Sequence, residues 1–242
     1  MRSWLSLGWQ IFSRHRWLLL SGILILVAAG LIQELALGNG GFSFYPGAEP
    51  DTVPRRSGFA SMVDLLLSLF LWPLAYTGYQ YLALRAVRGE VASLRDMLVP
   101  FRQPLSVLGA HWLSVIVTVI GLFLLVIPGI AWGLKFMFSP LVAADKGRPT
   151  LGAMGESEAL TVGHRWALLG LAAVFLSPYF ALGALGYLTL IGELLHWGWW
   201  LLVAYGVELV IRPWLTASFA AAYHDLDQAS RPAHSLFPGT EA

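Results

Sequence analysis

The residues of this chain that could do chemistry are charged side chains inside long apolar runs. Arg212 lies in the last such run, and Glu208 precedes it by one helical turn. This acid-then-base order favours an ion pair on one helix face. Pro213 has no amide hydrogen, so the carbonyl of Leu209 becomes an open acceptor. A charged pair beside an opened turn is typical of substrate or ion sites in transporters, but such a pair more often serves only to lock its helix into a bundle.

Three other charges, Lys135, Asp64 and Glu34, lie at comparable depth in separate apolar runs. Each charge costs roughly 2.5–3.5 kcal/mol at the centre of a membrane helix, so a partner of opposite sign is favoured. We therefore expect Lys135 to pair with Asp64 or with Glu34 and to stabilise one half of a helical bundle. Two alternatives stay open. Lys135 could extend to the lipid headgroups, or the three groups could form a proton or ion relay.

Sequence signatures of enzymes are missing. The 6 histidines form no HExxH pair, and no His, Asp or Glu cluster has metal-ligand spacing. The chain also lacks a nucleophile elbow, a P-loop, a dinucleotide fingerprint and any cysteine. We therefore expect no catalytic residue, no cofactor and no metal site, and a protein that is not an enzyme. An intramembrane hydrolase would need a nucleophile–base pair, which the spacing does not supply.

The composition is that of a membrane protein. Of 242 residues, 57% are hydrophobic and 12% are charged, and the mean hydropathy is +0.67, far from the average of soluble domains. The apolar residues form runs of about 20 residues, the length of a membrane-spanning helix. We predict an all-α polytopic membrane protein with about six transmembrane helices in three helical hairpins. The predicted spans are 17–37, 59–84, 106–127, 130–144, 166–191 and 199–222, with a Pro128–Gly129 turn between the third and the fourth.

Amphipathic and polar segments flank these spans. We predict an interfacial amphipathic helix over residues 1–16, with a signal peptide as the rival interpretation. A second interfacial helix is expected in the cytoplasmic segment 85–105, where Ser93 and Asp96 form a capping box. The domain 17–226 also contains an extracytoplasmic loop at 38–58 and a cytoplasmic segment at 145–165, and a polar cytoplasmic tail follows at 227–242. The apolar side of the first helix consists of Trp4, Leu5, Leu7, Trp9, Ile11 and Phe12.

The positive charges set the orientation. Six spans place both termini on one side, and that side holds most of the lysines and arginines, whereas Arg55 and Arg56 lie opposite. The positive-inside bias makes the basic side cytoplasmic. Because the basic residues flank spans, we expect anionic lipid headgroups as their partners and no nucleic acid. The basic side holds Arg2, Arg14, Arg16, Arg85, Arg88, Arg95, Arg102, Lys146, Arg148, Arg165 and Arg231.

Motifs in the second half of the chain resemble those of a known family. A first group is similar to the pattern PGI…R/K…P…D, and consists of Pro128, Gly129, Ile130, Lys135, Pro140 and Asp145. A second group is similar to A-x3-S-x2-LT-x-G-x2-W, and consists of Ala153, Ser157, Leu160, Thr161, Gly163 and Trp166. The closing Tyr223, Asp225 and Leu226 are similar to a YxDL end. Over residues 93–226 the chain thus resembles the bacterial six-span membrane domain associated with glycerophosphodiester phosphodiesterases, and the stand-alone relatives of that domain.

The resemblance implies a helical architecture in a bacterial inner (plasma) membrane. It does not imply phosphodiesterase activity, which in the family belongs to a separate soluble domain for which this chain has no room. Two functions then fit the sequence. The first is a non-enzymatic accessory, scaffolding or membrane-organising protein, which could dock a protein partner in the membrane. The second is a small permease or permease subunit for a lipid or amphipathic solute that uses Glu208, Arg212 and Lys135.

Overall fold

The computed structural model describes residues 2–37, 57–174, 176–177, 180 and 197–230. Every regular element within these ranges is a helix, which confirms the predicted all-α class for this part of the chain. Nearly all of the predicted loop at 38–58, the second half of the predicted span 166–191 and most of the predicted tail at 227–242 lie outside the described residues.

The helices follow one another with short connections. The first part holds α1 (Arg2–Arg14), α2 (Arg16–Ala36), α3 (Gly58–Leu66), the π-helical segment η1 (Leu67–Leu71), α4 (Trp72–Val87) and the 3-10 helix η2 (Leu94–Arg102). The second part holds α5 (Pro104–Leu124), α6 (Val126–Phe136), α7 (Ser139–Lys146), α8 (Thr150–Thr161), an apolar helix Arg165–Val174 and α10 (Trp197–Ser230).

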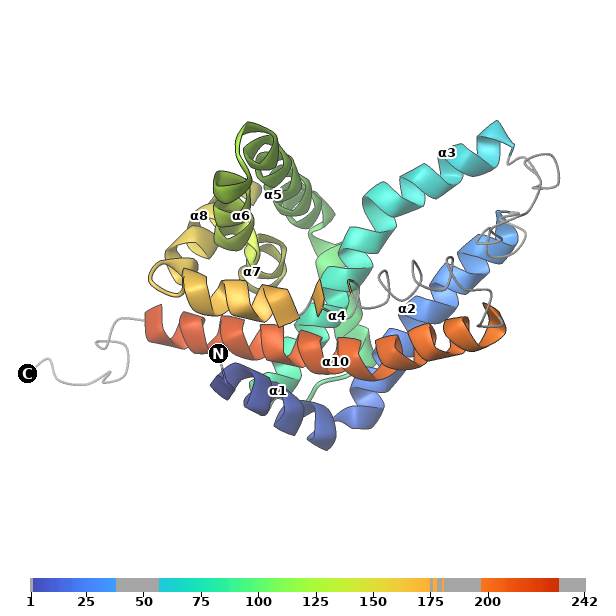
Figure 1. Ribbon diagram of the computed structural model, residues 1–242, viewed down its shortest axis with the longest axis horizontal. Helices are drawn as coiled ribbons and strands as arrows, with labels where there is room; N and C mark the ends of the chain where they lie inside the picture. The colour runs from blue at the N-terminus through green and yellow to red at the C-terminus, as the bar shows by residue number, and fades with distance from the viewer. Residues whose placement is uncertain (1, 38–56, 175, 178–179, 181–196, 231–242) are drawn as a thin grey trace, which may run out of the picture.

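The helices are arranged around α10. Figure 1 shows α10 running across the molecule, with α1 alongside it, α4 meeting it from above and α2 crossing it from below. From there α3 and the α5–α6 pair rise as two diverging arms. We use the name base for the end of the molecule where α1, the lower half of α4, η2, α7, α8 and the second half of α10 gather.

Three of the described helices are long and apolar enough to cross a membrane. They are Gly58–Val87, Pro104–Leu124 and Val126–Lys146, and a fourth is counted if α1 and α2, which meet at an angle of 90°, form one bent span. Their large apolar side chains face outward, as Phe123 does with 89% of its surface exposed. Such helices indicate a membrane protein. The predicted number of six spans and the three-hairpin arrangement are not confirmed, because the last two predicted spans fall on Arg165–Val174 and α10, which are not among these helices within the described residues.

The α5–α6 pair turns earlier than predicted. The sequence placed the turn at Pro128–Gly129, whereas the chain reverses at Leu125 and both residues lie inside α6. Proline is tolerated there because amides in the first turn of a helix have no partner within it. Gly129 instead allows close packing, since a Cβ atom at this position would lie 2.4 Å from the backbone nitrogen of Leu122. Small residues that let two helices approach are usual in membrane bundles.

A proline also interrupts the long helix Gly58–Val87. The carbonyl of Leu69 would accept a hydrogen bond from residue 73 in a regular α-helix, but Pro73 has no amide hydrogen. The indole Nε1 of Trp112 on α5 donates to this carbonyl at 2.8 Å. The irregular turn Leu67–Leu71 is thereby satisfied by a neighbouring helix, as apolar surroundings require.

Replacing Trp112 with Phe should therefore destabilise the protein by about 1 kcal/mol, the net contribution of a typical hydrogen bond, because this bond is only partly buried. Phenylalanine also lacks the second ring of the indole, so the loss includes some packing as well as the hydrogen bond. Unfolding in detergent, followed by circular dichroism, measures the effect. Trp166→Phe is the matched control, because Trp166 is 86% exposed. Equal stability of the two variants would contradict the assignment.

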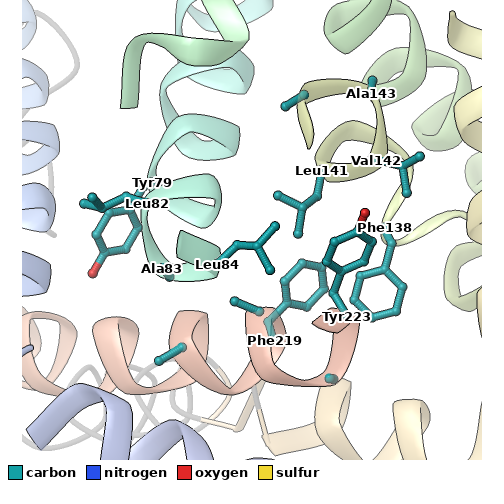
Figure 2. Close-up of a cluster of buried hydrophobic side chains, with 14 of the residues drawn as sticks. Tyr79, Leu82, Ala83, Leu84, Phe138, Leu141, Val142, Ala143, Phe219 and Tyr223 are labelled. Atoms are coloured by element: carbon teal, nitrogen blue, oxygen red, sulfur yellow. The ribbon is translucent and has the colours of Figure 1, made fainter. Parts of the chain in front are cut away.

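The core lies in the base. Figure 2 shows Leu84 of α4, Leu141 of α7 and Tyr223 of α10 pointing toward one another, with the rings of Phe138 and Phe219 beside Tyr223. The rings of Phe138 and Phe219 are 4.8 Å apart, and those of Phe138 and Tyr223 are 5.6 Å apart. In α10 all residues from Leu215 to Tyr223 are buried, and the alanines among them allow neighbouring helices to pack closely. This half of α10 is thus the central element of the fold.

Candidate functional site: the polar network of the base

A largely buried ion pair joins the C-terminal end of α4 to α7. Arg88 Nη1 and Nη2 donate to the two carboxylate oxygens of Asp145, each at 2.6 Å. The hydroxyl of Tyr223 on α10 donates to the same carboxylate at 2.9 Å. Burial alone would lower the pKa of Arg88, but the hydrogen bonds and charge of Asp145 outweigh it and leave that pKa raised. Burial and the charge of Asp145 also raise the pKa of Tyr223, which keeps its hydroxyl as a donor.

A second ion-pair group lies beside the first. Lys146 on α7 bonds to Glu156 on α8 and to Asp227 on α10, whose side chain is only 1% exposed. Arg85 on α4 donates to Asp96 on η2 at 2.6 Å. The backbone amide of Ser93 donates to the same carboxylate at 2.7 Å, so the predicted capping box is present. We call these pairs, together with Arg88, Asp145 and Tyr223, the polar network; it ties α4, η2, α7, α8 and α10 to one another.

Ser157, a residue of the family-like motif, supports the interruption between α6 and α7. Its hydroxyl donates to the carbonyl of Lys135 at 2.7 Å and accepts from the amide of Phe138 at 3.2 Å. In an uninterrupted helix these two groups would bond to backbone one turn away. Pro140 favours the interruption, because its ring and missing amide are poorly tolerated inside a helix. One hydroxyl from α8 therefore satisfies both backbone groups.

The predicted pair of Lys135 with Asp64 is wrong. Lys135 instead bonds to Glu158 on α8 at 2.5 Å. Asp64 accepts from Gln33 Nε2 at 2.7 Å, which links α3 to α2. The reason is that Lys135 belongs to α6, which packs beside α8, whereas Asp64 belongs to α3, which forms the other arm (Figure 1). The side chain of Glu34, the alternative partner, lies outside the described residues.

The Lys135–Glu158 pair makes a pH-dependent contribution to stability. The hydrogen bond and charge of Lys135 lower the pKa of Glu158 below its ordinary value of 4.5. A lowered folded-state pKa gives stability that is complete above the unfolded value and is lost as the pH falls through the folded value. The difference in melting temperature between the wild type and Glu158→Gln should thus hold above pH 4.5 and shrink in more acidic buffer. A difference that does not change with pH would refute the pairing.

Arg212 contacts α4. Its Nη1 donates to the hydroxyl of Tyr76 at 2.8 Å, and its guanidinium lies 5.5 Å from the centre of the same ring. The predicted partner Glu208 belongs to α10, but its side chain lies outside the described residues, so the predicted pair stays a prediction. Of the other motif residues, Gly163 adopts a φ of 82° after α8, which favours glycine, and Trp166 is exposed.

The first and last helices are joined at the base. The indole of Trp4 donates to Asp225 at 2.7 Å, and the indole of Trp214 donates to the carbonyl of Leu5 at 3.0 Å. Gly8 faces Ser218 so closely that a Cβ atom would lie 2.7 Å from the Ser218 Cα atom. The buried side of α1 therefore packs on α10, while Trp9 on the same predicted apolar side remains half exposed. The amphipathic pattern of α1 is therefore explained at least in part by its packing on α10.

A cavity of about 270 Å³ opens between α5 and the α6–α7 break. His111 and Thr118 line it from α5, and Gly133, Met137 and Pro140 from the other side. The hydroxyl of Thr118 donates to a carbonyl of its own helix at 2.7 Å, so the cavity gains little polarity from it. Within the part of the chain that the structure describes, no group of three His, Asp or Glu residues could hold a metal ion.

The residues that form the polar network were only partly visible in the sequence. Asp145 and Tyr223 belong to the family-like motifs, and the structure brings these two motifs together across 78 positions. Arg88 was placed only among the basic flanking residues, because a polar segment gives no sign of which arginine turns inward.

Comparison with protein-family models, with curated proteins and with solved structures finds no match for this chain.

Proposed function

We propose that the protein is a non-enzymatic integral protein of a bacterial inner membrane and acts as an accessory, scaffolding or membrane-organising component. One observation carries the proposal. The charges in the base pair with one another across helices, so the polar network joins the helices into a platform instead of lining a route through them. The proposed orientation puts this platform, with both termini, on the cytoplasmic side.

The edge of the platform supports contact with anionic lipid. In η2 the buried side is fixed by Asp96 and Met97, and the exposed side presents Leu98 together with Arg95 and Arg102. Apolar side chains beside arginines are typical of helices that lie in the membrane interface. Each such basic residue near an anionic surface contributes about 1 kcal/mol.

The permease alternative has less support. Of its three residues, Lys135 is engaged by Glu158, and the cavity beside α5 is lined by residues that do not include Arg212. The contact that the structure describes for Arg212 is with Tyr76 on α4, which gives the permease alternative no solute path.

A reconstitution experiment tests the proposed function. The purified protein is placed in vesicles with and without phosphatidylglycerol, and its melting temperature is measured. We expect the anionic lipid to raise the melting temperature, and the Arg95→Gln/Arg102→Gln double variant to lose most of this rise while keeping its stability in neutral vesicles. The same vesicles are loaded with fluorescent amphipathic solutes. Flux above that of protein-free vesicles, abolished in a folded Arg212→Gln variant, would overturn the proposal in favour of a permease.

A further inference from the structure

The cavity of about 270 Å³ lies along the arm that α5 and α6 form (Figure 1), and we call it the groove. A Cβ atom at Gly133 would lie 3.2 Å from Thr118 Cγ2, so these two lining residues face each other. The α5–α6 pair runs antiparallel from the reversal at Leu125, and the groove extends from there as far as His111 and Pro140. His111 and Thr118 are 7 positions apart on α5, which makes the groove about 10 Å long.

The groove opens to the outside of this arm. Val115 and Val119 line it and are 37% and 43% exposed. The surface of α5 next to the opening is apolar as well, since Ile116 and Ile120 are 51% and 50% exposed. Both walls belong to helices long and apolar enough to cross a membrane, Pro104–Leu124 and Val126–Lys146. The opening therefore lies where the proposed membrane would supply hydrocarbon.

The walls of the groove do not suit water. Its volume would hold several water molecules, and each ordered water needs about 2–4 polar partners. Among the lining residues only His111, Ser114 and Thr118 have nitrogen or oxygen atoms in their side chains. The hydroxyls of Ser114 and Thr118 already donate to carbonyls of their own helix, at 2.6 and 2.7 Å. Cavities lined by apolar groups stay dry and take up apolar molecules.

The shape of the groove selects a chain. A volume of about 270 Å³ over a length of about 10 Å leaves a cross-section of roughly 5 Å by 5 Å. This width admits a single hydrocarbon chain, whereas a helix with its side chains is about 10–12 Å across. Walls on both sides give such a chain more carbon–carbon contacts than the convex surface of one helix does. The flexible side chain of Met137 on one wall can adapt to the shape of the chain.

We infer that the groove between α5 and the α6–α7 break binds one acyl chain of a membrane phospholipid. The inference rests on the proposed membrane insertion and deepens the proposed lipid contact. Arg95 and Arg102 select the charge of a headgroup, whereas the groove holds a chain whatever the headgroup is.

Photochemical labelling from a lipid chain tests this site. The full chain is reconstituted in phosphatidylcholine vesicles that include a phosphatidylcholine with a photoreactive diazirine in one acyl chain. After illumination, the labelled residues are identified by mass spectrometry of peptides. We expect Val119 and Met137, which line the groove, to be labelled several times more than Ile120, which is similarly exposed but does not line it.

Two variants of neighbouring residues link the labelling to the groove. Val115→Trp places a large ring in the groove, so labelling of Val119 and Met137 should fall to the level of Ile120. Ile116→Trp is the matched control, because Ile116 is exposed outside the groove, and it should leave the labelling unchanged. The melting temperature in lipid-free detergent checks that each variant folds. If Val115→Trp fails to fold, Ser114→Leu replaces it, since Ser114 also lines the groove.

Three outcomes would overturn the inference. The first is equal labelling of Val119 and Ile120 in the wild type, which is what fluid lipid around the arm gives. The second is unchanged labelling in a folded groove variant. The third is protection of Val119 and Met137 that grows with the protein-to-lipid ratio, which would assign the groove to a second copy of the chain. Phosphatidylcholine has no net charge, so each of these outcomes leaves the test of the proposed function with phosphatidylglycerol intact.

Discussion

Replacing Asp145 with Ala should cost about 3–5 kcal/mol of the free energy of unfolding. The two side chains of the Arg88–Asp145 pair are 18% and 6% exposed, so the substitution leaves a buried guanidinium without its carboxylate. The hydroxyl of Tyr223 loses the same acceptor. Because the three residues come from α4, α7 and α10, the loss should loosen the whole base. Unfolding in mixed detergent micelles measures the change.

Two companion variants define the cause. Asp145→Asn keeps the shape and one oxygen acceptor, so it should lose less than the alanine variant. Glu90→Ala removes the ion pair between Arg85 and Glu90, whose side chain is 42% exposed. Exposed ion pairs contribute about 0–1 kcal/mol, so this variant should lose little stability. A loss below about 1 kcal/mol for Asp145→Ala would show that the polar network does not hold the base together.

Replacing Gly78 with Ala should separate η2 from α4. A Cβ atom at this position would lie 2.0 Å from the carbonyl oxygen of Met97. The obstacle is backbone, so no side-chain rotation relieves it, and overpacking of this kind costs about 1–3 kcal/mol. The displaced segment should become a substrate for trypsin at Arg95 and Arg102, which gives a local readout beside the melting temperature.

The matched control for this change is Gly155→Ala. Gly155 lies in α8, and a Cβ atom there meets nothing within 4 Å. Alanine in an exposed helix position is better than glycine by up to about 1 kcal/mol. We therefore expect a neutral or small stabilising effect. Similar losses in both variants would mean that helix propensity, and not the contact between Gly78 and Met97, determines the result.

Local patterns in the sequence predicted local structure well. Within the described residues the apolar runs form helices, because run length and low polarity are enough to predict them, and the capping box Ser93–Asp96 spans only four residues. The Pro128–Gly129 turn failed, because proline fits the first turn of a helix as well as a loop. Gly129 allows α5 and α6 to pack closely, and a Pro-Gly pair in the sequence does not distinguish such a packing position from a turn.

Partners of charged residues could not be predicted in the same way. Lys135 and Glu158 are 23 positions apart, and Arg88 and Asp145 are 57 apart. Which carboxylate a cation reaches depends on the angles between helices, and these are set by packing contacts such as Gly8 with Ser218. The family-like motifs carried part of this information, since Asp145, Ser157 and Tyr223 all proved to bond across helices. The roles of Arg212 and Glu208 remain predictions.

The contact between α1 and α10 imposes an order on biogenesis. Trp4 and its partner Asp225 are 221 positions apart, so the first helix leaves the ribosome long before its binding site exists. At synthesis rates of ~5–20 residues per second this interval lasts on the order of ten to forty seconds. During this interval the apolar side of α1 has no partner on α10, and in the proposed function the membrane surface would cover it. The 90° bend after Arg14 sets the direction of α1 apart from that of α2, so α1 can pack along α10 only after this last helix has been made.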